Sequence, residues 1–226
     1  MRLVAISDTH GFHSGMEVPD GDVLVCCGDW SRGFGSWKDT ERFARWMAKW
    51  PHRYKLVTPG NHDYAVQEFP LQAERLFASY DCILVAKRRL EIQGILIDGG
   101  PWGPETGASP AWGFECSEEA RERHWSAVGH VDVLITHVPP LGILDLTRKG
   151  GRQGCSVLRH HVFERIRPRL HLFGHTHEGY GRHEEDGIVF VNASNCTRLN
   201  FAKETDFTIM TMGIRDPLVY DLEATP

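Results

Sequence analysis

The stretch "LVAISDTH", residues Leu3–His10, sets the pattern from which the fold is predicted. Its first residues are apolar at successive positions, which is typical of a strand buried on both faces in a parallel sheet. The run stops abruptly at polar residues, among them Asp8 and His10. Because sites in open α/β sheets form beyond the carboxyl ends of strands, we expect both side chains at a sheet edge where a site can form.

The same arrangement recurs along the chain. Each further run is short, rich in Val, Ile and Leu, and ends at a polar or glycine-rich turn. These runs are Asp22–Cys27, Tyr54–Pro59, Asp132–His137 and Leu170–Phe173. Together with the first run they predict strands in the middle of a sheet, with their carboxyl ends along one rim.

Helical patterns separate these runs, and strand-like runs with short turns occupy two further regions. The helical patterns are Ser36–Trp50, Val66–Tyr80 (interrupted by Pro70), Ser117–Val128 and Ser156–Pro168. The strand-like regions, Cys82–Asp98 and Gly187–Asp221, predict a second, antiparallel or mixed sheet. We therefore expect one domain over residues 1–226, with an α/β fold of two packed sheets and helices on the outside.

Composition excludes several classes of protein. The chain has 226 residues, 24% of them charged, and a net charge of -5, which is typical of a globular protein and leaves no basic tract for long nucleic acids. No run approaches the roughly 20 apolar residues of a membrane span, and the N-terminus resembles no signal peptide. The six cysteines form no C-x-x-C motif. We therefore expect a cytoplasmic protein with reduced thiols and no membrane partner.

Side chains of the metal-ligand type follow the predicted strands. They are Asp8, His10, Asp29, Asn61, His137, His175 and His177. Each motif alone is compatible with a solvent-exposed turn, but the full set at successive strand ends predicts a metal site. Carboxylate and imidazole together suit Mn, Fe or Zn, and the absence of a cysteine ligand argues against a structural zinc site.

The number of these ligands predicts two divalent metal ions as cofactors, because it exceeds what one ion needs. Two ions about 3.5–4 Å apart suit in-line displacement at phosphorus, and they supply hydroxide near neutral pH. Such a pair needs a bridging carboxylate, for which Asp29 in "GDW" is the natural candidate.

The motifs "DTH", "GDW", "GNHD", "THVPP" and "GHTHEGYG", in this order, resemble the calcineurin-like metallophosphoesterase superfamily. The motifs "GGPWGP", "AWGFE", "GCSVL" and "NASNC" resemble a narrower group, the metallophosphoesterase-domain-containing proteins related to class III cyclic-nucleotide phosphodiesterases. This resemblance implies a four-layer α-β-β-α sandwich of two mixed sheets flanked by helices.

The resemblance also implies a role for each motif residue. One ion would be held by Asp8, His10, Asp29 and His177, and the other by Asp29, Asn61, His137 and His175. His62 would face the phosphate and either protonate the leaving oxygen or stabilise the transition state, and Asp63 would orient His62.

Three further residues are candidates for substrate contacts. Arg32 follows the bridging aspartate closely, and Trp102 and Trp112 lie in the long irregular stretch Gly99–Phe114. Each has an alternative role: Arg32 as a solvated loop arginine, and the two tryptophans in packing this stretch onto the body.

These observations predict a phosphodiesterase that acts on small or cyclic nucleotides through metal-activated hydroxide. A phosphomonoesterase, a protein phosphatase and a catalytically weak metal-binding scaffold on the same fold remain as alternatives. The expected partner is a small phosphoester substrate, with no long nucleic acid and no membrane. The sequence leaves the oligomeric state open, and a dimer is compatible with it.

Overall fold

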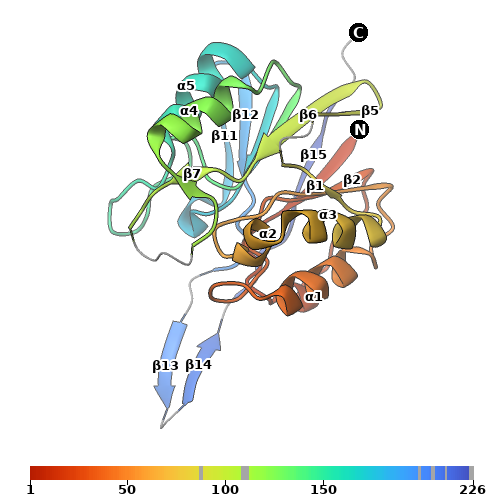
Figure 1. The fold of residues 1–226 in the computed structure, drawn as a ribbon, viewed down its shortest axis with the longest axis vertical. Helices are drawn as coiled ribbons and strands as arrows, with labels where there is room; N and C mark the ends of the chain where they lie inside the picture. The colour runs from red at the N-terminus through yellow and green to blue at the C-terminus, as the bar shows by residue number, and fades with distance from the viewer. Residues whose placement is uncertain (87–88, 108–111, 198–199, 205–206, 212, 224–226) are drawn as a thin grey trace.

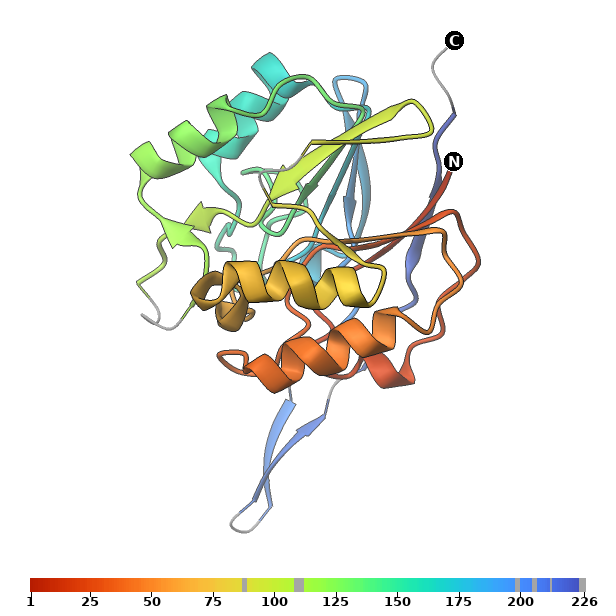
Figure 2. The same ribbon diagram turned by 45° about the vertical axis from the view of Figure 1, so that its right-hand side comes forward.

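The computed structural model describes all residues except 87–88, 108–111, 198–199, 205–206, 212 and 224–226, and for residues 200–204 and 207–211 it describes the backbone alone. Two mixed sheets lie at the centre of the molecule, with helices on the outer side of each (Figures 1 and 2). The predicted α/β fold and its four-layer arrangement are confirmed. No helix in the described part of the chain is long and apolar enough to cross a membrane.

The first sheet has the strand order β15-β1-β2-β3-β4. Strands β1 to β4 are parallel, and β15 runs antiparallel to β1 at the edge. Their bounds are β1 Arg2–Ile6, β2 Val23–Cys26, β3 Tyr54–Val57, β4 Ile83–Leu84 and β15 Leu218–Asp221.

The second sheet has the order β11-β12-β10-β9-β6-β5. Its four central strands are parallel, and β5 and β11 pair antiparallel at the two edges. The bounds are β5 Leu90–Ile92, β6 Ile95–Gly100, β9 Val133–Thr136, β10 Leu170–Phe173, β11 Gly181–Glu185 and β12 Ile188–Asn192.

The helices form the outer layers. Those beside the first sheet are α1 Trp37–Met47, α2 Tyr64–Glu68 and α3 Pro70–Ser79, and those beside the second are α4 Glu118–Ser126 and α5 Ser156–His161, continued by a π-helical turn Val162–Ile166 (Figure 1). The remaining elements are the 3₁₀ turns His13–Gly15 and His177–Gly179, the short pair β7 Gly103–Pro104 and β8 Glu115–Cys116, and the hairpin of β13 Asn200–Glu204 and β14 Phe207–Thr211. This hairpin projects from the body (Figure 2).

The predicted helices form where the sequence places their caps. Ser36 and Asp39 make a reciprocal capping box at the start of α1, which satisfies two backbone N–H groups that the first helical turn leaves unpaired. Ser117 caps α4 through the N–H of Ala120. Pro70 stands at the start of α3 and separates it from α2, because proline cannot donate a backbone hydrogen bond inside a helix.

The apolar runs are buried on both faces because each sheet lies between the other sheet and a helix layer. In β1, Leu3 and Ala5 belong to the cluster between the sheets, whereas Val4 and Ile6 pack beneath α1 and α3. Successive side chains of a strand point to opposite faces, so a run in this position must be apolar throughout. A separate cluster packs the second sheet against α4 and α5.

One prediction about the sheets is wrong. The five motif-bearing runs do not lie in one sheet: β1, β2 and β3 belong to the first sheet, and β9 and β10 to the second. The two predicted strand-rich regions are likewise divided, since β4 and β15 join the first sheet. The sequence could not separate the two groups, because both sheets are covered on both faces and therefore carry the same apolar pattern.

Candidate metal centre

The carboxyl ends of the strands from both sheets meet at one edge of the sandwich. Backbone contacts fix this junction, since the N–H of Asn195 donates to the carbonyl of Ser7 at 2.9 Å and Ser7 forms a parallel bridge with Ser194. His137, which follows β9 of the second sheet, donates from Nδ1 to the carbonyl of Cys27, which follows β2 of the first sheet, at 2.8 Å. The loops after β1, β2, β3, β9 and β10 therefore converge on one place.

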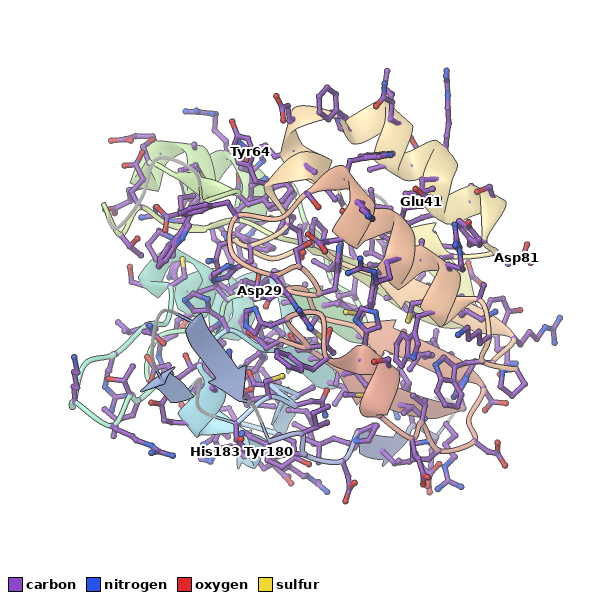
Figure 3. The ribbon with its side chains drawn as sticks, turned by 90° about the horizontal axis from the view of Figure 1, so that it is seen from below. Asp29, Glu41, Tyr64, Asp81, Tyr180 and His183 are labelled. Carbon is purple, nitrogen blue, oxygen red and sulfur yellow. The ribbon has the colours of Figure 1, made fainter. Side chains whose placement is uncertain are left out.

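Four of the candidate ligands have a left-handed backbone: φ is 53° at Asp8, 43° at His10, 57° at Asp29 and 67° at His175. Such conformations cost free energy in non-glycine residues and gather at functional sites. They turn the chain sharply at the strand ends, so that side chains from different loops face one another. Seen from below, Asp29 lies between the orange segments of the first half of the chain and the teal segments of the second (Figure 3).

One group of candidate ligands consists of Asp8, His10 and His177, whose ligand atoms lie within 4.8 Å of one another. The Nε2 atoms of His10 and His177 are 3.2 Å apart, and His177 Nε2 lies 3.4 Å from Asp8 Oδ1. His10 donates its Nδ1 proton to the carbonyl of Ser31 at 3.2 Å, which turns Nε2 toward this group. This geometry leaves imidazole and carboxylate lone pairs directed at one point.

A second group joins Asp29, His137 and His175, again with ligand atoms within 4.8 Å. His137 Nε2 lies 3.3 Å from Asp29 Oδ2 and 3.0 Å from Asn61 Oδ1. His175 Nδ1 lies 3.0 Å from the same Asn61 oxygen and 3.2 Å from His137 Nε2. Asp29 also forms a group with His10 and His62. It therefore stands between the two sets of ligands, where a bridging carboxylate is expected.

These residues fit divalent cations on two grounds. Asp8 Oδ1 is buried and makes no hydrogen bond in the part of the chain that the structure describes, although it faces His177 Nε2 at 3.4 Å. Burying a charged oxygen in this way is costly unless a cation binds it. Burial lowers the pKa of both His10 and His175 to about 4, so each ring is neutral at pH 7 and has a free lone pair.

The negative charge of Asp29 changes the protonation of His137. Although burial opposes the shift, Asp29 raises the pKa of His137 to about 9, and a proton then lies between His137 Nε2 and Asp29. To hold a divalent ion, His137 would have to give up this proton, because metal ligation requires the neutral imidazole. The loops thus place both nitrogen and oxygen donors around each position.

Ser194 supports the first group and was not predicted from the sequence. Its hydroxyl donates to Asp8 Oδ2 at 2.9 Å, and the backbone N–H of His175 donates to the same oxygen at 2.9 Å. Both bonds hold the carboxylate so that Oδ1 faces the ligand group. Gly174 allows this close approach, because a Cβ there would lie 2.2 Å from Asp8 Oδ2. The signal for Ser194 was the motif "NASNC", to which no role was assigned.

Asp63 does not orient His62, contrary to the prediction. Its buried carboxylate accepts backbone N–H bonds from Asp29 at 2.8 Å, Gly60 at 2.8 Å and Ser31 at 3.1 Å. Burial and the negative charge of Asp29 raise the pKa of Asp63 to about 7, and the bonds from Gly60 and Ser31 oppose this shift. The role that the structure gives to Asp63 is to join the loops after β2 and β3 beneath the candidate ligands.

The carbonyl of Gly33 orients His62 instead, by accepting a hydrogen bond from His62 Nδ1. The other ring nitrogen, Nε2, lies 4.0 Å from Asp29 Oδ2, and the His62 backbone N–H donates to Asp29 Oδ1 at 2.8 Å. His62 therefore lies beside the ligand groups with one ring nitrogen free. The loop carbonyl carries no side-chain signal, so the sequence could not indicate it.

A cavity of about 250 Å³ opens over both ligand groups and His62. Trp112 lines it, with its ring 5.7 Å from that of His62, and a substrate contact by this ring stays a prediction. Arg32 is not among the lining residues, and its guanidinium lies over the ring of Phe12 at 4.6 Å. Arg152 lines the cavity and was missed, because it lies in a loop rather than at a strand end.

Trp102 lies apart from this cavity. It is 8% exposed, stacks on His124 with ring centroids 4.0 Å apart, and meets Trp125 edge to face at 5.2 Å. The structure thus supports the alternative role, in which Trp102 packs its loop onto the body, and not the predicted substrate contact. Both roles place an aromatic side chain in an irregular loop, so the sequence did not distinguish them.

Replacing His175 with glycine is expected to weaken the ion held by Asn61, His137 and Asp29 by more than about tenfold, with a much smaller effect on the other ion. The reason is that His175 Nδ1 faces only the second group. Titration of the metal-free protein with Mn²⁺ measures both affinities. His183→Gly removes an exposed histidine and serves as the matched control. Equal loss of both ions would contradict the division of ligands.

Two packed mixed sheets with His and Asp groups at their joined edge are the arrangement expected of the metallophosphoesterase class. The family model described as "Calcineurin-like phosphoesterase" matches residues 1–179. The chain belongs to this family, and the His and Asp groups indicate a binuclear site for divalent metal ions, as is typical of it.

Relatives and solved structures agree with this assignment. The chain is 34% identical to human metallophosphoesterase domain-containing protein 1 over 87% of its own length and 66% of that protein, so it spans just under two thirds of this relative. It is 37% identical to UPF0046 protein K07C11.7 of Caenorhabditis elegans, over 88% of this chain and 71% of that protein.

Two solved structures share the fold at low sequence identity. Protein TT1561 of Thermus thermophilus superposes with a TM-score of 0.61 at 16% identity, over 85% of this chain and 88% of that one. Phosphopantetheinyl hydrolase PptH of Mycobacterium tuberculosis superposes with a TM-score of 0.53 at 15% identity and the same coverage. At this identity both support the fold alone.

Proposed function

We propose that the chain is a phosphodiesterase that hydrolyses small nucleotide esters, cyclic nucleotides among them. The observation that carries this proposal is the pair of ligand groups sharing Asp29, with His62 and Trp112 beside them on one cavity. A pair of divalent ions supplies Lewis acidity at the phosphoryl oxygens and lowers the pKa of water to about 7.

His62 acts on the leaving group in this proposal. Its Nδ1 is held by the carbonyl of Gly33, so Nε2 is the atom available to give a proton to the departing oxygen. General acid catalysis of this kind contributes about 10²–10⁴-fold to a rate. Trp112 offers an aromatic face next to this position, on which a nucleobase can stack.

The cavity favours a small substrate over a phosphoprotein. Its volume of about 250 Å³ lies just below the range of about 300–1,000 Å³ found for small-molecule sites, so only part of a nucleotide fits inside it. A phosphomonoesterase remains the second candidate, because the same ligand groups and His62 serve both ester classes.

Chelation tests the proposal. With bis-p-nitrophenyl phosphate as substrate, we expect release of p-nitrophenol in Mn²⁺, loss of activity on dialysis against EDTA, and recovery on adding Mn²⁺ again. Activity that persists without metal would contradict it. A protein that binds less than one Mn²⁺ per chain and hydrolyses neither this diester nor p-nitrophenyl phosphate would instead be a scaffold on the same fold.

A further inference from the structure

Arg152 brings positive charge to the cavity over the ligand groups. Among the described residues that line this cavity, it is the one arginine or lysine. The ligands and His62 account for the phosphate that reacts, whereas Arg152 lies in the loop between β9 and α5 and belongs to neither ligand group. It is therefore placed to bind a different part of the substrate.

The loop holds Arg152 in position. The guanidinium Nη1 donates to Asp145 Oδ1 at 2.6 Å, and Asp145 is fully buried while the Arg152 side chain is 49% exposed. The other carboxylate oxygen of Asp145 accepts the N–H groups of Gly142 at 2.9 Å and Gly154 at 3.2 Å. Because a fixed guanidinium loses less conformational freedom on binding, this arrangement suits recognition of an anion.

Part of the guanidinium is available for a ligand. The contact with Asp145 uses Nη1, and no hydrogen bond from Nη2 or Nε of Arg152 is found to the residues that the structure describes. Arginine binds phosphate through two parallel N–H groups, which is the geometry that this free edge offers.

A basic groove continues from the cavity past Arg152. This groove, of about 650 Å³, shares Arg152 and Gln153 with the cavity and is also lined by Arg148 and Lys149. Glu178 is the acidic residue on its wall. With three cationic side chains and one carboxylate, the lining of this groove is net positive, although the net charge of the protein is -5.

A second groove does not offer the same chemistry. It has a volume of about 700 Å³, its ionisable lining residues are Glu74, Glu115 and Cys116, and its other walls include Leu71 and Phe114. A small pocket of about 10 Å³ shares Glu115 with this groove and Thr106 with the cavity. Of these two grooves, the one that contains Arg152 is therefore the one whose charge suits a further anionic group.

We propose that Arg152, with Arg148 and Lys149, forms a second anion subsite, so that the preferred substrate is a nucleotide diester carrying a further phosphate group beside the one that is hydrolysed. This inference rests on the proposed phosphodiesterase activity and narrows its substrate class. If the inference holds, the enzyme prefers nucleotides with two phosphates to cyclic nucleotides with one.

Two chromogenic esters that differ in one phosphate test the subsite. They are thymidine 5′-(p-nitrophenyl phosphate) and the same compound with a 3′-phosphate. In both, water adds to the 5′-phosphorus and p-nitrophenolate leaves with the P–O bond electrons. We expect kcat/KM to be about 10- to 100-fold higher for the 3′-phosphorylated ester, the range for hydrogen bonds to charged groups, and the ratio to fall as salt rises.

Variants separate the contribution of each cation. Arg152→Gln is expected to bring the ratio of kcat/KM values close to one, and Arg152→Lys to restore part of it. The double variant Arg148→Gln/Lys149→Gln leaves the contact between Arg152 and Asp145 in place, and we expect it to lower the ratio of kcat/KM values several-fold. This variant tests the subsite even if Arg152→Gln disturbs the loop. Arg45→Gln, at an exposed arginine of α1 paired with Glu41, is the control that keeps the ratio unchanged.

The outcomes distinguish the two proposals. Equal kcat/KM for both esters in the unmodified protein, or an undiminished ratio in the Arg152 and Arg148/Lys149 variants, would overturn the second subsite while leaving the phosphodiesterase intact. Failure to hydrolyse either ester or bis-p-nitrophenyl phosphate in Mn²⁺ would overturn the proposed function itself.

Discussion

Replacing Asp29 with asparagine is expected to lower both metal occupancy and kcat/KM by more than about 100-fold, since even outer-shell substitutions cost about 10–100-fold. Asparagine keeps the shape of the side chain and one acceptor oxygen, so the change removes mainly the negative charge. That charge is shared: Asp29 forms groups with His137 and His175 on one side and with His10 and His62 on the other. One substitution should therefore weaken both ions.

Metal analysis after loading with Mn²⁺, together with steady-state kinetics, measures this effect. Asp81→Asn is a matched control, because Asp81 is an exposed residue with φ of 54°, close to the 57° of Asp29, and lies far from it (Figure 3). The control should keep two ions and full activity. Two ions bound at unchanged affinity in Asp29→Asn would contradict the bridging role.

The sequence predicts much of this site because of a simple geometric rule. Strands covered on both faces must be apolar throughout, so polar residues such as Asp8 and His137 stand out where each strand ends. Parallel strands bring these ends to one edge, and residues far apart in the chain can then be assigned to one place. The structure brings these side chains together even though the strands belong to two sheets and not to one.

The errors concern residues whose role depends on side-chain direction. The sequence places Asp63 next to His62, but the carboxylate points to the backbone N–H groups of three loop residues and not to the imidazole. Trp102 and Trp112 occupy the same kind of loop, yet one is stacked on His124 and the other faces His62. No spacing rule applies in irregular segments, so position alone could not separate these cases.

Arg152 illustrates a different limit. Its loop is fixed by hydrogen bonds between residues of the loop itself, such as Thr147 N–H to the carbonyl of Gly151 at 2.8 Å, and by the buried carboxylate of Asp145. The sequence of such a loop has no periodicity. It therefore does not distinguish an arginine that lines a cavity from one that is exposed to solvent. Its place at the cavity became visible only from the three-dimensional structure.

Replacing His62 with alanine is expected to lower kcat by about 10²–10⁴-fold on diesters with an alkyl leaving group, while both ions stay bound. His62 donates from Nδ1 to the carbonyl of Gly33 and keeps Nε2 free beside Asp29. If Nε2 protonates the departing oxygen, the loss of kcat must be larger for leaving groups whose oxygen is more basic. Esters of p-nitrophenol, whose anion leaves without protonation, should lose far less.

Comparison of a thymidine dinucleotide with bis-p-nitrophenyl phosphate, under saturating Mn²⁺, measures this dependence. His183→Ala, at an exposed histidine paired with Glu185, is the matched control and should leave kcat unchanged on both substrates. Equal losses on both substrates in His62→Ala would mean that His62 stabilises charge on the phosphoryl group and does not transfer a proton. Because His62 is not among the assigned ligands, a loss of metal in this variant would contradict that assignment as well.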